Sequence, residues 1–215
     1  MRKQSARSKF SRARFFEMKR ISRNPIPGVA LGLENEMQKI TLSVFLFLFA
    51  PSAFAADFWG EAQVSSRNKM LTHQVNGRAS GGSWFVFGQS VEGGYRQAYA
   101  GPKVSPTEWL EIGAAIGAET ISEGWGFRFG SYVWAGKDRW SSLVSYENGR
   151  VTGSWYKGIL KYQVVPSLAL GIQTQKHRGD GVRAEYSINK AVSVWGTVLR
   201  KDETLTTQMA VRVTF

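Results

Sequence analysis

The sequence predicts an all-β fold in which a single domain forms an antiparallel, up-and-down β-barrel. The stretch 57–215 has no sustained helical periodicity. It consists instead of short alternating segments rich in Val, Ile, Tyr, Trp and Phe, which recur every 10–14 residues. Gly, Asn, Asp, Pro and Ser separate these segments, and such residues favour tight turns. Together these observations predict consecutive β-hairpins without a linker or a second domain.

The segment 37–56 differs from the barrel segment and is typical of a secretory signal peptide. A basic residue follows Met37, an apolar run covers 40–50, and the segment ends in the small residues around Ala55 and Ala56. The apolar run has 11 residues, whereas a transmembrane helix needs about 20. We therefore expect export and cleavage rather than a membrane anchor.

The basic segment 1–36, which carries nine Lys and Arg against three acidic residues, has two interpretations. It is either a long positive start of the signal peptide or an extension ahead of a true start at Met37. We favour the second interpretation, with 1–36 either untranslated or a disordered basic extension. N-terminal sequencing of the precursor distinguishes the two. The predicted division is therefore 1–36, signal peptide 37–56 and barrel domain 57–215.

The composition of the barrel segment excludes several functions. Residues 57–215 carry 18 Lys and Arg against 13 Asp and Glu. This modest excess does not indicate nucleic-acid binding, which requires basic residues gathered on one face. The chain has no cysteine, so disulfides and thiolate metal sites are ruled out. No phosphate loop, dinucleotide fingerprint or zinc motif occurs, and we expect neither a cofactor nor a metal.

The alternation predicts twelve strands, with ten as the alternative and eight less favoured. In the last strand, apolar residues from Leu205 to Phe215 alternate with smaller or polar ones from Thr206 to Thr214. The least convincing strand is 69–76, and without it the even count typical of bacterial barrels falls to ten. The predicted strands are 57–66, 69–76, 82–90, 94–103, 108–119, 124–135, 139–148, 151–164, 167–177, 181–189, 191–200 and 204–215.

Two features predict that the apolar face of these strands points outwards, as in a transmembrane barrel. The polar face is rich in Gly, Ala, Ser, Thr and Gln with interspersed opposite charges, which suits a narrow lumen. Aromatic residues gather towards strand ends, a position that favours the lipid–water boundary. They are Trp59, Trp84, Tyr95, Trp109, Trp125, Trp140, Tyr146, Trp155, Tyr186 and Phe215. A secreted soluble barrel with an apolar interior is the alternative fold.

The final strand resembles the insertion signal of bacterial outer-membrane β-barrel proteins. In that broad family a last strand of alternating apolar residues ends in an aromatic residue, usually Phe, which the barrel assembly machinery recognises. Met209, Val211, Val213 and Phe215 match this pattern. The resemblance covers the signal peptide and the whole segment that follows. It implies an outer-membrane location, contact with outer-membrane lipid and lipopolysaccharide, and insertion by the assembly machinery. It leaves the oligomeric state and the function open.

Short connections favour a passive function. Twelve strands of about ten residues each leave connections of about three or four residues, too short for lids or plugs. We therefore predict a narrow passive pore or a mainly structural barrel. The candidates for the lumen are Arg96, Glu111, Glu119, Arg128, Lys157, Lys161, Arg183, Glu185 and Arg212. Six of these nine are basic, so a water-filled lumen should weakly favour anions.

Two other functions stay open. A lipid-modifying barrel enzyme would need a serine hydroxyl beside His73 or His177, but no motif links a serine to either histidine. The glutamates of the barrel are interpreted as partners of Arg and Lys rather than as acid–base catalysts, and no catalytic residue is assigned. A non-enzymatic surface binding or assembly protein would use outward loops, which this sequence keeps short.

Overall fold

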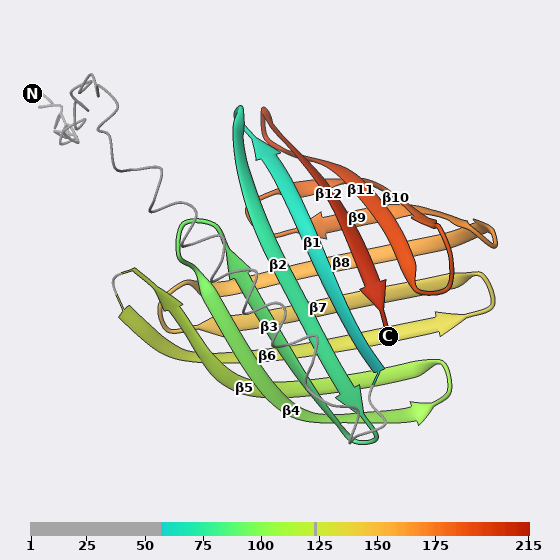
Figure 1. Cartoon of the computed structure of the whole chain (residues 1–215), viewed down its shortest axis with the longest axis horizontal. Coiled ribbons are helices and arrows are strands. Elements are labelled where there is room, and N and C mark those ends of the chain that lie inside the picture. The colour runs from blue at the N-terminus through green and yellow to red at the C-terminus, as the bar shows by residue number, and fades with distance from the viewer. Residues whose placement is uncertain (1–56, 123) are drawn as a thin grey trace, which may run out of the picture. The chain divides into compact units, whose positions relative to one another are not determined.

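The computed structural model describes residues 57–122 and 124–215, which form one closed barrel of twelve antiparallel strands (Figure 1). The predicted signal peptide and basic segment lie outside the described residues. The strands are β1 (Asp57–Arg67), β2 (Met70–Gly81), β3 (Trp84–Val91), β4 (Arg96–Thr107), β5 (Leu110–Ile121), β6 (Gly124–Lys137), β7 (Trp140–Gly149), β8 (Gly153–Val165), β9 (Leu168–Gln175), β10 (Gly179–Ser187), β11 (Val192–Lys201) and β12 (Thr204–Thr214). The all-β fold and the preferred count of twelve are confirmed, and the doubtful segment 69–76 belongs to a 12-residue strand. Within the described ranges no helix is long and apolar enough to cross a membrane.

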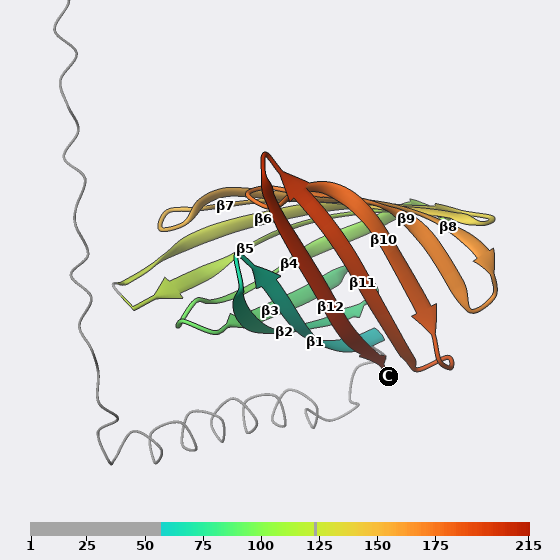
Figure 2. The same cartoon turned by 90° about the horizontal axis from the view of Figure 1, so that it is seen from above.

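The strands follow one another around the barrel in sequence order, and β12 closes it by pairing with β1. The closing register places Trp59 opposite Thr214 and Glu61 opposite Arg212. Because neighbours in sequence are neighbours in space, each connection is a hairpin, as the turn residues predict. β1 to β3 lie across the lumen from β7 to β9 (Figure 2).

An even number of strands brings both ends of the described barrel to the same side. The backbone N–H of Phe215 donates to the carbonyl of Phe58 over 2.8 Å. We call this side the terminal end and the opposite side the far end, where connections include 68–69, 150–152 and 176–178. The tight turns use left-handed backbone conformations, as at His177 with a φ of 69°.

The outer surface of the barrel is apolar and the lumen is mostly polar. Ile116 on β5 and Met209 on β12 keep 67% and 66% of their surface exposed on the outside. Gln208, the neighbour of Met209 in the same strand, keeps only 1%. This arrangement inverts that of a water-soluble barrel and is typical of a barrel surrounded by lipid. The soluble alternative, with its apolar interior, does not fit.

Candidate functional site

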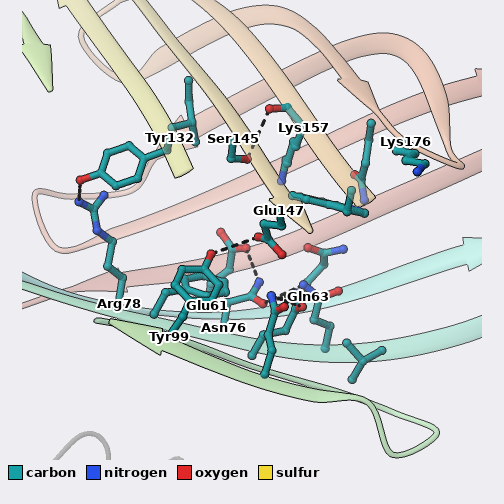
Figure 3. A pocket seen from close by; sticks show the side chains of 18 of the residues that line it. Glu61, Gln63, Asn76, Arg78, Tyr99, Tyr132, Ser145, Glu147, Lys157 and Lys176 are labelled. Atoms are coloured by element: carbon teal, nitrogen blue, oxygen red, sulfur yellow. Dashed lines mark hydrogen bonds between the residues drawn. The ribbon is translucent and has the colours of Figure 1, made fainter. Parts of the chain in front are cut away.

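The barrel encloses a cavity of about 430 Å³ in its lumen. Thr152 and His177, from turns at the far end, line one part of this cavity, and Arg78 and Tyr132 line another. Side chains reach into the cavity from opposite walls, with Lys157 on one side and residues of β1 and β2 on the other (Figure 3). The lumen therefore contains a space in which a small solute fits.

The most buried ion-pair cluster centres on Arg128 in β6. Its Nε and Nη2 donate to Glu147 Oε2 over 2.9 and 2.6 Å, and its Nη1 donates to Glu119 Oε2 over 2.7 Å. Glu119 also accepts the backbone N–H groups of Val151 and Thr152, over 2.7 and 3.1 Å. The side chain of Arg128 is only 3% exposed. The cluster thus joins three strands to the β7–β8 turn.

A second cluster gathers around Glu111 in β5. Lys103 of β4 donates to its Oε2 over 2.8 Å, and Arg78 of β2 donates to its Oε1 over 2.9 Å. The hydroxyl of Tyr132 in β6 donates to the same Oε1 over 2.6 Å. The carboxylate of Glu111 in β5 therefore holds two cations and a phenol from three other strands.

Two further groups of charges lie on the walls made by β8 to β12 and β1. Glu61 accepts from Arg212 Nη2 over 2.7 Å, between neighbouring strands. Glu185 accepts from Arg183 and from Lys161, each over 3.1 Å. With the two clusters above, every lumen glutamate in the described part of the chain is bonded to at least one cation.

Amide side chains cover much of the remaining lumen wall. Gln97 donates to Gln89 over 3.0 Å, and Gln89 donates to Asn76 over 3.1 Å. On another wall, Gln173 donates to Gln208 over 3.1 Å. An amide both donates and accepts hydrogen bonds, so this lining can bind water or a hydroxylated solute.

Three cations on the cavity wall have no carboxylate within 4.0 Å among the described residues: Lys157, Lys176 and Arg178. The Nζ of Lys157 stands 5.3 Å from the ring centroid of Trp195. Lys176 donates to the carbonyl of Ser154 over 2.7 Å. Six Lys and Arg side chains line the cavity against two glutamates, so its net charge is positive.

Two titratable side chains, His177 and Glu92, lie in turns at the far end. Burial, followed by the repulsion from Lys176 and other cations, lowers the pKa of His177. His177 is therefore neutral at neutral pH. Glu92, in the β3–β4 turn, hydrogen-bonds His73 Nδ1 over 2.8 Å, and this bond holds the pKa of Glu92 below its usual value.

Three solved porin structures are similar to this chain. The KdgM porin in complex with disordered oligogalacturonate has a TM-score of 0.63 at 12% identity, and the match covers 73% of this chain and 99% of that one. The KdgM porin alone gives 0.60 at 11% identity, with 73% and 99% covered. The NanC porin gives 0.54 at 8% identity, with 73% and 100% covered. The chain has the fold of these porins. No family model and no curated protein matches the sequence.

The structure places eight of the nine predicted lumen residues on the lumen face of this porin-like barrel: Glu111, Glu119, Arg128, Lys157, Lys161, Arg183, Glu185 and Arg212. The prediction was wrong for the ninth residue, Arg96. Gln97 is buried in the lumen and Tyr99 lines the cavity, so the alternation turns Arg96 outwards, where it is exposed. The sequence Tyr95-Arg96-Gln97 is polar on both faces, so its pattern did not identify the inward face.

Several lumen residues were missing from the prediction, among them Glu61, Arg78, Lys103 and Glu147. Arg78 lies in the strand with the weakest alternation. Lys103 lies next to Pro102, and proline lowers the strand signal. Strand alternation identifies these residues as lumen-facing, because each lies an even number of positions from another lumen residue of its strand.

Three of the aromatic residues expected at the lipid boundary belong to the lumen instead. Trp59 and Trp155 line the cavity, and the hydroxyl of Tyr95 donates to Gln97 over 2.6 Å. Trp125 and Tyr146 do lie exposed on the outside. Of the four residues matching the insertion signal, Met209, Val211 and Phe215 are exposed, and Val213 has the same parity.

The histidines do not assemble a catalytic group in the described residues. The imidazole of His73 pairs with Glu92 on the exposed far end, and no hydrogen bond joins a serine hydroxyl to His73 or to His177. The serine hydroxyl beside a histidine that a lipid-modifying enzyme would need is therefore not found in the described residues. Nor does any group of three His, Asp or Glu side chains within 57–122 and 124–215 suit a metal ion.

Proposed function

We propose that this protein spans the bacterial outer membrane as a narrow passive pore that favours anions. The apolar outer face suits contact with lipid tails. The closed barrel pairs the backbone N–H and C=O groups of neighbouring strands, as a lipid environment requires. The polar cavity supports passage of water and solutes. The fold shared with the KdgM and NanC porins supports the same function.

The observation that carries the anion preference is the set of cavity cations without a carboxylate partner. Lys157, Lys176 and Arg178 face the cavity, whereas the lumen glutamates are each bonded to a cation. Fixed side-chain charges along a pore determine which ions it admits. A lumen whose free charges are positive attracts anions and repels cations.

The solutes that suit this lumen include small sugar acids. The cavity is lined by aromatic rings, such as those of Trp155 and Tyr99, and by amides such as Gln97. Rings pack against the apolar face of a sugar, and amides bond its hydroxyl groups. The KdgM porin was solved with oligogalacturonate, a chain of acidic sugars, which supports testing this class here.

The insertion route and membrane contacts follow from the same proposal. The exposed residues Met209, Val211 and Phe215 contact outer-membrane lipid and form the signal for the barrel assembly machinery. The terminal end then faces the periplasm. The far end then faces the lipopolysaccharide leaflet.

Swelling of proteoliposomes in three hexose derivatives tests the function. Glucose, glucuronate and glucosamine have similar size and are neutral, negative and positive. We expect glucuronate to enter fastest and glucosamine slowest, with the difference reduced in Lys157→Glu and kept in Lys190→Glu, an exposed turn position. Swelling no faster than in protein-free vesicles overturns the pore, and fastest entry of glucosamine overturns the anion preference.

A further inference from the structure

The inner end of the cavity is crossed by a polar crossbar, which we define as Arg78, Lys103, Glu111 and Tyr132. Arg78 Nη2 donates to the Tyr132 hydroxyl over 2.6 Å (Figure 3). The same Nη2 donates to Glu111 Oε1 over 2.9 Å. The Arg78 guanidinium also lies over two rings, 4.7 Å from the centroid of Tyr132 and 5.4 Å from that of Phe85. Because β2 is not a neighbour of β5 or β6, these bonds run across the lumen rather than along its wall.

The position of the crossbar makes it a constriction. Arg78 and Tyr132 line the cavity, whereas Lys103 and Glu111 do not and lie on the side away from it. Phe85 is only 2% exposed and packs edge-to-face on Tyr132, with centroids 5.0 Å apart. A solute that moves through this side of the lumen therefore meets the Arg78 side chain.

Arg78 can leave the crossbar without exposing an unpaired charge. Lys103 Nζ lies 2.8 Å from Glu111 Oε2, so Glu111 keeps an ion pair when Arg78 departs. Arg78 itself is incompletely bonded, because its buried Nε has no hydrogen-bond partner in the described part of the chain. A buried donor without a partner costs free energy, which favours a second position in which the guanidinium is fully bonded.

We propose that Arg78 is the gate of the pore and that an anionic group of the solute opens it. In the closed position Arg78 bonds Glu111 and Tyr132 across the lumen. A carboxylate that reaches the inner end of the cavity offers two acceptor oxygens, which match the planar fork of a guanidinium. Arg78 then turns from Glu111 to the solute, while Lys103 continues to neutralise Glu111. This inference rests on the proposed pore function.

Single-channel recording in planar bilayers tests the gate with two arginines of different geometry. Arg212 also lines the cavity and pairs with a glutamate, but it bonds Glu61 on the neighbouring strand, along the wall. The gate predicts that Arg78→Gln raises the conductance in KCl, whereas Arg212→Gln lowers it. A lumen in which arginines act only through their charge predicts a lower conductance for both.

Two further measurements sharpen the test. Lys103→Gln leaves Arg78 as the only cation on Glu111, so we expect fewer openings. Added glucuronate should raise the open probability of the wild type but not of Arg78→Gln. Should Arg78→Gln fail to fold, as judged by heat-modifiable gel migration, Arg78→Lys retains the charge but lacks the fork and should also open the pore.

The outcomes separate the gate from the pore. If neither the folded wild type with added glucuronate nor the folded Arg78→Gln variant conducts, both proposals are overturned. If the wild type and Arg212→Gln conduct but Arg78→Gln does not exceed the wild type, only the gate is overturned. The same holds if glucuronate leaves the open probability of the wild type unchanged.

Discussion

At the residue scale, the lumen is stabilised by shared charges rather than by separate ion pairs. Arg128 forms ion pairs with both Glu119 and Glu147, whereas Glu111 forms ion pairs with two cations. Arg128 and Glu119 are almost fully buried, so bulk water solvates neither charge. Removal of one partner leaves the other charge uncompensated, which is much more costly than loss of an exposed pair.

Arg128→Ala should therefore lower the free energy of unfolding by about 3–5 kcal/mol, because two buried carboxylates lose their cation. Urea-induced unfolding in detergent, followed by tryptophan fluorescence, measures the change. Arg96→Ala is the matched control: this arginine is exposed on the outer face, and we expect a change within about 0.5 kcal/mol. Equal losses in the two variants would show that the buried cluster does not stabilise the barrel.

At the element scale, glycines let tyrosine rings lie against neighbouring strands inside the lumen. A Cβ at Gly113 of β5 would overlap the ring of Tyr132 from β6. At Gly130 of β6, a Cβ would lie 3.2 Å from Cζ of Tyr99. At Gly113 only a residue without a side chain leaves room for the ring, whereas at Gly130 the contact with Tyr99 is merely tight.

Gly113→Ala should destabilise the barrel by about 1–3 kcal/mol through overpacking against Tyr132. Gly60→Ala in β1 is the control, since its added Cβ meets no atom within 4 Å and should change the stability by less than about 0.5 kcal/mol. The same urea titration compares them. A Gly113→Ala barrel as stable as the wild type would mean that Tyr132 does not need this space.

Periodicity predicted the elements well because each strand has one face in the lumen and one outside. Ile159 is an exception in β8, because this apolar residue shares the lumen face with Lys157 and Lys161 and lines the cavity. The partners could not be predicted in the same way. Arg78 and Tyr132 are 54 positions apart and meet only because closure of the barrel brings their strands across the lumen. Partner choice depends on strand tilt and stagger, which a single strand does not encode.

At the scale of the whole molecule, the barrel presents apolar side chains outwards and charges inwards. Ile172 on β9 is 59% exposed, whereas Gln173 beside it is 2% exposed. In water an exposed isoleucine side chain contributes little to the stability of a fold. In a bilayer it contacts lipid tails, and a charge at the same place is strongly disfavoured.

Ile172→Arg should destabilise the protein in lipid vesicles by about 2–4 kcal/mol, the cost of a cation near the bilayer midplane. Glu203→Arg, in the exposed β11–β12 turn, is the control and should change the stability within about 0.5 kcal/mol. Unfolding by urea in vesicles measures both. A harmless Ile172→Arg would indicate that this face is surrounded by water.

The reversal potential across a planar bilayer with a KCl gradient tests the central claim most directly. We expect the wild-type pore to favour chloride over potassium, because Lys157, Lys176 and Arg178 face the cavity without carboxylate partners among the described residues. Lys157→Glu should shift the potential towards potassium, and Lys190→Glu should leave it unchanged. A folded protein that forms no channel, or one whose preference for potassium is the same before and after Lys157→Glu, would contradict the claim.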